Sequence, residues 1–429
     1  MSAMKTLRTR PEIESFLALL GRRARGADPG TEEAVRKILA GVRRGGDRAL
    51  KRYTKRFDGH ERLRVGPREI KRLADRADRG LVEALAFSAK RIRRFHERQR
   101  EKSWSYTEGG ITLGQIIRPI ARAGVYVPGG KAAYPSTLLM NVIPAQVAGV
   151  REIAVAVPSP GGEVNPSVMA AARLLGVTEV YCVGGAQAVA ALAYGTETVG
   201  KVDKIVGPGN IYVALAKRMV FGEVDIDMIA GPSEVLIIAD SSAPPAYIAA
   251  DLLSQAEHDE LASPVLVTDS PALAEAVRGE LRAQLAKLRR KAIARRSLAR
   301  YGAAIIVKDL EEAARISNRI APEHLEVMTR APRKLLPLLE NAGAIFLGPL
   351  STEPLGDYAA GPNHTLPTGG TARFSSPLGV YDFMKRSSLL EFTQKGFMAL
   401  AGTVEKVADQ EGLEAHANAV RIRRPGRGR

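Results

Sequence analysis

The sequence predicts an α/β fold: two successive Rossmann-like parallel-sheet units, with an N-terminal helical region before them and a small C-terminal tail domain after them. Between about residues 111 and 347, short apolar runs bounded by Gly or Pro alternate with helical patterns. Such alternation is typical of parallel sheets with right-handed crossovers. At 429 residues the chain is also long enough for two or three domains.

The N-terminal helical region is expected at residues 1–110. One helix should begin at Pro11, with acidic residues in its first turn, and a second should follow residues 28–31. A third, Arg-rich helix is expected at 81–102 because apolar side chains recur along one side of it.

The first α/β unit is expected at residues 111–232. Its strands are predicted at 123–127, 153–157, 180–183 and 204–206, and its helices at 136–148, 167–175 and 186–194. Sheets of this kind bind ligands at the carboxyl ends of their strands, so both units are expected to do so.

The second α/β unit is expected at residues 233–377, and residues 378–429 are expected to form a short polar tail whose last part, 421–429, has a biased composition. The strands of this unit are predicted at 234–239, 264–268, 304–307, 326–328 and 344–347. Its helices are predicted at 247–258, 271–295, 310–319 and 333–340.

The charge distribution favours a solvated Arg-rich surface over a nucleic-acid-binding site. Of the net charge of +17, most comes from residues 1–102, which hold 29 Lys or Arg and 14 Asp or Glu. Acidic residues are interspersed among these, and few aromatic residues are available to stack on bases. We therefore expect no nucleic-acid partner.

The chain has no run of 18 apolar residues and no N-terminal pattern of a secretory signal, so we expect no membrane partner. The single cysteine, Cys182, excludes an intrachain disulfide and fits a reducing compartment. Because Cys182 lies on a predicted strand, it is interpreted as a small buried hydrophobic residue. The expected location is cytoplasmic.

Glu323 and His324, within Ala321–Leu325, are the first candidates for acid/base chemistry. The chain has only six histidines, and four of them follow residue 250 in a region rich in Gly, Asp, Asn and Ser. Scarce histidines that gather near carboxylates suggest a metal site combined with proton transfer. The alternative is that Glu323 and His324 are a surface pair without function.

Three other segments carry candidate ligands. Gln255 and His258 lie at positions i and i+3 of a predicted helix, so they face the same side and could bind zinc or manganese. Asp357 lies in a Gly-rich loop, and His416 lies near the C-terminus. The alternative for Gln255 and His258 is a polar helix end. For Asp357 it is a surface turn, and for His416 it is a solvated helix end.

Three glycine loops follow apolar strands, at residues 126–130, 183–187 and 206–210. Glycine lets backbone N–H groups approach a phosphate at a helix N-terminus. None of the loops matches G-x-G-x-x-G, so the common dinucleotide motif is absent, and tight turns are the alternative to nucleotide binding.

Taken together, these segments resemble the histidinol dehydrogenase family over about residues 30–420. The matching motifs are Arg122–Gly130, Tyr134–Thr137, Ile205–Ala214, Asp227–Val235, Ser254–His258, Ala321–Leu325, Gly356–Tyr358 and Phe374–Val380. The resemblance implies a homodimeric, zinc-dependent NAD oxidoreductase. It would convert L-histidinol to L-histidine through L-histidinaldehyde in two hydride transfers, the last step of histidine biosynthesis.

The resemblance also implies roles for individual residues. Glu323 and His324 would be the acid/base pair, and NAD+ would contact Tyr126, Gln187 and Asn210. One Zn2+ per subunit would be held by Gln255, His258, Asp357 and His416, the last supplied by the partner subunit. The implied substrate contacts are Ser233, Gln255, His258, His324, Asp357, Glu411 and His416.

Two other functions are compatible with parts of the sequence. A related dehydrogenase could act on a different small alcohol, such as a sulfopropanediol. Glu411 and His416 argue against it, because a sulfonate would need Arg or Lys whereas a cationic amino-imidazole needs a carboxylate. A basic, non-catalytic nucleic-acid-binding protein would leave the set of polar site residues unexplained.

Overall fold

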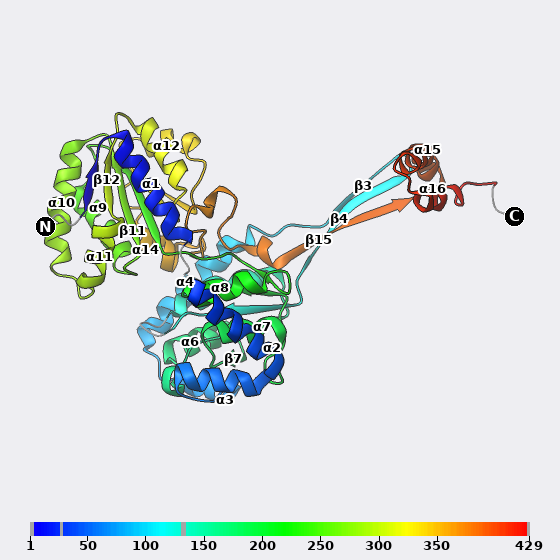
Figure 1. The fold of residues 1–429 in the computed structure, drawn as a ribbon, viewed down its shortest axis with the longest axis horizontal. Coiled ribbons are helices and arrows are strands. Elements are labelled where there is room, and N and C mark those ends of the chain that lie inside the picture. The colour runs from blue at the N-terminus through cyan, green and yellow to red at the C-terminus, as the bar shows by residue number, and fades with distance from the viewer. Residues whose placement is uncertain (1–3, 26–28, 130–133, 427–429) are drawn as a thin grey trace. The chain divides into compact units, whose positions relative to one another are not determined.

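The structure, a computed structural model, describes residues 4–25, 29–129 and 134–426 (Figure 1). The expected helix start at 28–31, the glycine loop at 126–130 and the biased end at 421–429 extend partly outside these residues. The chain forms two compact units. The first comprises the residues up to Gln99 together with Ala121–Phe383, and the second comprises Arg100–Ile120 with the residues from Met384 onward.

The first unit contains a six-stranded sheet with the order β2-β7-β6-β5-β8-β9. All neighbours are parallel except the edge pair β2 and β7. The strands are β2 (Arg64–Val65), β5 (Arg122–Tyr126), β6 (Glu152–Ala156), β7 (Glu179–Tyr181), β8 (Lys204–Val206) and β9 (Asp225–Ile226). The connecting helices are α5 (Pro135–Ala148), α6 (Pro166–Leu174), α7 (Gly185–Tyr194) and α8 (Ile211–Val220).

A second six-stranded sheet in the same unit is parallel throughout, with the order β1-β12-β11-β10-β13-β14. Its strands are β1 (Lys5–Leu7), β10 (Glu234–Ala239), β11 (Ser263–Thr268), β12 (Ala303–Ile306), β13 (His324–Met328) and β14 (Ala344–Leu347). Buried residues of α9 (Pro245–Ala256), α10 (Pro271–Leu285) and α11 (Lys291–Tyr301) form the core on one face. Those of α1 (Arg10–Arg25) and α12 (Leu310–Ile320) form it on the other.

The helices of the first hundred residues are divided between the two sheets. β1 pairs with β12 and α1 packs on the second sheet, whereas α2 (Pro29–Asp58) packs on the first sheet beside α7 and α8. The region also includes α3 (Pro67–Ala74) and α4 (Arg79–Glu97). These helices thus complete both cores, because a sheet buries its apolar surface only where helices cover both faces.

Two helices of the second α/β unit differ from the prediction. The helix expected at 271–295 is broken into α10 and α11, and this break lets Leu285 and Ala294 both face the same core. The helix expected at 333–340 is α13 (Pro332–Leu335) followed by a 3-10 turn. Pro337 explains the change because it lacks the N–H that a continuing α-helix needs.

The second compact unit contains a three-stranded antiparallel sheet, β15-β4-β3, and two helices (Figure 1). Its elements are β3 (Trp104–Glu108), β4 (Ile111–Pro119), β15 (Met384–Phe392), α15 (Gln394–Gln410) and α16 (Glu414–Arg421). The sequence prediction missed this sheet, because β15 pairs with a strand far away along the chain. Among the described residues, no helix is both long enough and apolar enough to cross a membrane.

Candidate active site

The candidate catalytic residues meet at the amino edge of the second sheet. Ser233 directly precedes β10, Glu323 directly precedes β13, and the parallel pairing places Val235 beside His324. These candidates therefore lie at the amino edge of this sheet and not at the carboxyl ends of its strands, where ligand binding was expected. Because α9 runs back from the carboxyl end of β10, its last turn returns Gln255 to the same amino edge.

The turn before β13 fixes the direction of the acid/base pair. α12 is followed by its C-cap Ala321, whose φ of 51° makes it the one non-glycine residue with positive φ among those described. This conformation is disfavoured for a residue with a Cβ, so the surrounding packing must hold it. The backbone N–H groups of Gly343 and Ala344 donate to the carbonyls of Pro322 and Glu323, both at 2.9 Å, and tie the turn to β14.

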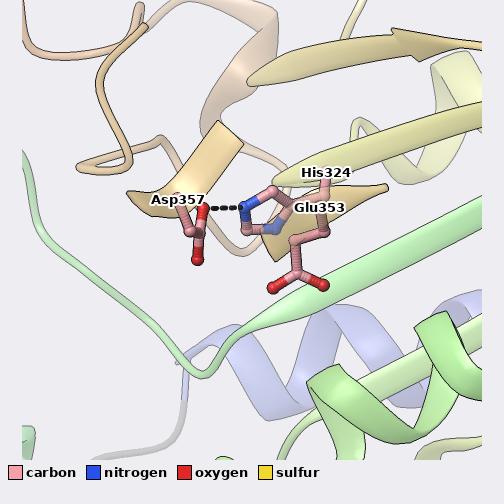
Figure 2. A group of neighbouring side chains, drawn as sticks. All are labelled: His324, Glu353 and Asp357. Carbon is pink, nitrogen blue, oxygen red and sulfur yellow. Dashed lines mark hydrogen bonds and ion pairs between the residues drawn. The ribbon is translucent and has the colours of Figure 1, made fainter. Parts of the chain in front are cut away.

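The backbone of Glu234 holds both members of the pair. Its N–H donates to Glu323 Oε2 at 2.9 Å, and its carbonyl lies 3.0 Å from His324 Nδ1. A carbonyl can only accept, so Nδ1 carries a proton and Nε2 is the nitrogen directed toward the site. Nε2 lies 3.4 Å from Asp357 Oδ1, the dashed contact in Figure 2.

Glu234 itself is fixed by a buried ion pair with Arg23, from α1. Arg23 also donates to the carbonyl of Ser233 at 3.4 Å. The first helix of the chain therefore supports the start of β10, and through it the acid/base pair.

Burial and neighbouring charges shift the pKa values of the pair. Burial raises the pKa of Glu323 to about 8, with the charges of Glu234 and Asp357 adding to the rise and that of His324 opposing it. For His324, burial acts to lower the pKa, but the carboxylates of Glu353, Glu323 and Asp357 outweigh it and raise the pKa well above its usual value. Groups shifted in this way are typical of functional sites.

His324, Glu353 and Asp357 form a group that could hold a metal ion (Figure 2). One ligand atom from each lies within 4.8 Å of the others, and the three come from β13, α14 (Glu353–Leu355) and the π-helical turn Gly356–Ala360. One imidazole nitrogen with carboxylate oxygens is a donor set that suits zinc. The group therefore offers donors suited to the expected metal, although Asp357 is the one member that it shares with the expected ligands.

Glu353 was missed by the sequence prediction. It lies between Thr352 and Pro354 in the first turn of a short helix, directly before the loop that carries Asp357. Burial raises the pKa of Glu353 to about 7, while the charge of His324 opposes the rise. For Asp357, burial acts to raise the pKa, but the hydrogen bond and charge of His324 outweigh it and lower the pKa.

Of the two expected ligands near the end of α9, one contacts this group. The amide end of Gln255 faces Glu353, and with the amide nitrogen on that side Gln255 donates to both oxygens of Glu353, at 2.8 and 2.9 Å. His258 lies beyond the end of the helix at Ala256, in a turn where its N–H donates to the Gln255 carbonyl at 3.2 Å, and it is exposed. It lies outside the three-residue group, although the charges of Asp357 and His324 reach it.

A second buried carboxyl on β13 lies behind the site. Glu326 Oε1 accepts from the backbone N–H of Glu353 at 2.9 Å. Burial, together with the charge of Asp251, raises the pKa of Glu326 to about 9. This carboxyl therefore stays protonated in the folded protein at neutral pH.

We expect the metal-free protein to lose stability as pH rises from 5 to 9. The unfolded chain releases the Glu326 proton near its usual pKa of 4.5, whereas the folded chain keeps it to about 9. Between these values the unfolded state binds fewer protons, so each such group lowers the unfolding free energy by up to about 1.4 kcal/mol per pH unit. Denaturant titrations across this range should show that the unfolding free energy of Glu326→Gln declines less steeply with pH than that of the wild type. An equal decline in both proteins would contradict the raised pKa of Glu326.

The three expected cofactor contacts line one cavity of about 850 Å³ at the carboxyl edge of the first sheet. Tyr126 ends β5, and its hydroxyl accepts from the Gly185 N–H at 3.1 Å. Gln187 lies in the first turn of α7, and Asn210 caps α8 by accepting from the N–H groups of Tyr212 and Val213. The structure thus brings these three residues together where parallel sheets bind ligands.

The same cavity has polar groups suited to a nucleotide. Asp58, at the end of α2, lines it, and one of its carboxylate oxygens is buried without a partner in the part of the chain that the structure describes. Such an oxygen can accept from a ribose hydroxyl. Sequence analysis did not identify α2 as part of this site.

The remaining two expected residues lie in the second compact unit. Glu411 caps the end of α15, and His416 lies in α16, where its N–H donates to the Leu413 carbonyl at 3.0 Å. Both side chains are exposed.

Comparisons with known proteins agree with the motifs. A family model described as histidinol dehydrogenase matches residues 22–424. A histidinol dehydrogenase from Aquifex aeolicus is 56% identical over 417 residues, which cover 96% of this chain and 97% of that protein. One from Geobacter metallireducens is 54% identical over 421 residues, 96% of each chain.

A solved structure gives the same result for the fold. The crystal structure of a histidinol dehydrogenase from Elizabethkingia anophelis matches with a TM-score of 0.93 and 37% sequence identity, over 99% of this chain and 98% of that one. The chain therefore belongs to the histidinol dehydrogenase family, a family of oxidoreductases.

Proposed function

We propose that this protein is a zinc-dependent NAD oxidoreductase that converts L-histidinol to L-histidine through L-histidinaldehyde, the last step of histidine biosynthesis, in the cytoplasm. The observation that carries the proposal is the pair Glu323 and His324, which is held by the backbone of Glu234 beside a group of N and O ligands. The names of the related proteins support the choice of substrate.

In the first half-reaction, His324 Nε2 would take the proton of the substrate hydroxyl. Its Nδ1 donates a hydrogen bond to the Glu234 carbonyl, and this bond fixes the ring and leaves Nε2 for proton transfer. The nearby carboxylates keep the metal-free imidazole protonated. A cation bound at those carboxylates would offset their charge and lower the pKa of the ring.

In the second half-reaction, Glu323 would activate a water molecule for attack on the aldehyde. Its Oε2 is held by the Glu234 N–H, so we assign the proton transfer to Oε1. The raised pKa makes the carboxylate a stronger base than an ordinary Glu, which suits abstraction of a proton from water.

Zinc would be held by Gln255, His258 and Asp357, with His416 of the partner subunit completing the set. When bound, zinc orients the substrate through its imidazole and amine nitrogens. NAD+ would lie in the cavity of the first sheet, against Tyr126, Gln187 and Asn210, where it accepts the hydride.

These assignments give each part of the chain a proposed role. Residues 111–232 would bind NAD+, residues 233–377 would hold zinc and the catalytic pair, and residues 378–429 would form a tail exchanged between the subunits of a homodimer. Glu411 of that tail would contact the substrate, as would Ser233.

The charge of the site favours this substrate over a sulfonate-bearing alcohol. The acidic residues around His324 are Glu323, Glu353 and Asp357, whose charges act on it together. When ionised, these carboxylates would attract a cationic amino-imidazole and repel a sulfonate.

We expect Asp357→Ala and His258→Ala each to lose zinc and activity together. Loss of one ligand removes a bond and leaves the remaining set incomplete, so the affinity should fall steeply. Metal analysis of the purified variants, paired with NADH formation from L-histidinol, provides the test. Glu260→Ala is the matched control, because Glu260 lies two residues from His258 but pairs with Arg296 on the surface. A fully zinc-loaded but inactive His258→Ala protein would contradict the ligand assignment.

A further inference from the structure

Glu353 carries a buried carboxylate, and the proposed mechanism gives this residue no role. Its side chain is 2% exposed, and its backbone N–H is bound by Glu326. Its Oε2 also lies 3.2 Å from the Ser254 hydroxyl. A buried carboxylate held this firmly needs donors around it, because an unpaired buried charge is strongly destabilising.

The main donor to Glu353 is the amide of Gln255. When the amide is turned so that its nitrogen faces Glu353, it donates to both carboxylate oxygens, at 2.8 and 2.9 Å, whereas the reverse orientation sets oxygen against oxygen. When ionised, the carboxylate can only accept, so it selects the NH₂ end of the amide and excludes the reverse orientation. With its nitrogen fixed on Glu353, the amide turns its carbonyl oxygen to the opposite side.

That orientation is the one a metal ligand requires, because the oxygen of a glutamine amide binds cations and its nitrogen does not. We propose that Glu353 is a positioning residue that fixes the Gln255 amide with its oxygen presented to the zinc ion. This inference rests on the proposed function, in which Gln255 is a ligand. The competing role is that Glu353 binds the metal itself, since its carboxylate lies in one group with the His324 imidazole and the Asp357 carboxylate.

A double-mutant cycle separates these two roles. Zinc affinity is measured by competition with a chromogenic chelator for the wild type, Gln255→Ala, Glu353→Gln and the double variant. If Glu353 acts through Gln255, each single change should weaken binding about 10–100-fold, and the double variant should be no weaker than Gln255→Ala alone. Effects that multiply in the double variant would overturn the inference.

Cobalt substitution gives a second readout that a merely structural role would not change. The visible absorption of bound Co²⁺ depends on its ligand set. Glu353→Gln and Gln255→Ala should therefore produce the same spectral change, and different changes would overturn the inference. A wild-type protein that binds no zinc would instead refute the proposed function.

A crystal structure of the zinc-loaded wild type tests the inference without any substitution, should Glu353→Gln fail to fold. The Gln255 oxygen should lie at a bonding distance of about 2.0–2.2 Å from zinc, with both Glu353 oxygens still on the Gln255 nitrogen. A Glu353 oxygen bonded to the metal would overturn the inference.

Discussion

Replacing His324 with alanine is expected to lower the rate of NADH formation from L-histidinol by about 10²–10⁴-fold, the usual cost of losing a general base. The loss should fall on the first hydride transfer, because Nε2 is the nitrogen that the Glu234 carbonyl leaves free for proton transfer. Single-turnover measurements of the first NADH provide the check.

Glu323→Gln should show the complementary defect. The amide keeps the shape of the side chain but cannot take a proton from water, so oxidation starting from L-histidinaldehyde should slow more than the first hydride transfer. Thermal denaturation of both variants controls for folding. If the two variants ran both half-reactions at rates near those of the wild type, the pair would have no part in the mechanism.

Mixing two inactive variants is expected to restore activity if the tail is exchanged between subunits. His416→Ala and His258→Ala subunits, allowed to exchange at equal amounts, should form mixed dimers as about half of the population. Each mixed dimer would contain one site with both defects and one site with neither. NADH formation should therefore return to about a quarter of the wild-type level.

Each variant carried alone through the same exchange procedure is the control for this recovery. Two-fold symmetry makes the sites equivalent in a homodimer, so each control should stay inactive. If His416 served its own chain, every site in the mixture would keep one defect. No recovery in the mixture would then show that the tail is not shared.

Much of the fold could be predicted because its signals are local. The apolar runs at 235–239 and 264–268 lie in β10 and β11, since buried parallel strands are continuous apolar segments bounded by turns. The pairing of β15 with β4 could not be predicted, since the strands come from distant parts of the chain and neither is buried. Likewise, nothing local indicates that β1 joins the edge of the second sheet.

Part of the candidate site could also be predicted from the sequence. Glu323, His324 and Asp357 stand out by residue type and by their turn-rich surroundings, and the structure brings them together. Glu353 and Glu234 did not stand out, because their importance comes from what they contact after folding. Their carboxyl and backbone groups support neighbours that are distant in sequence, which no local pattern records.

The most direct test of the account is the number of NADH molecules formed per L-histidinol consumed, with and without a chelator. The zinc-loaded protein should form two NADH and release L-histidine, and removal of the metal should abolish both. A propanediol sulfonate offered in place of L-histidinol should give no NADH. Formation of a single NADH with release of the aldehyde, or full activity after metal removal, would contradict the account.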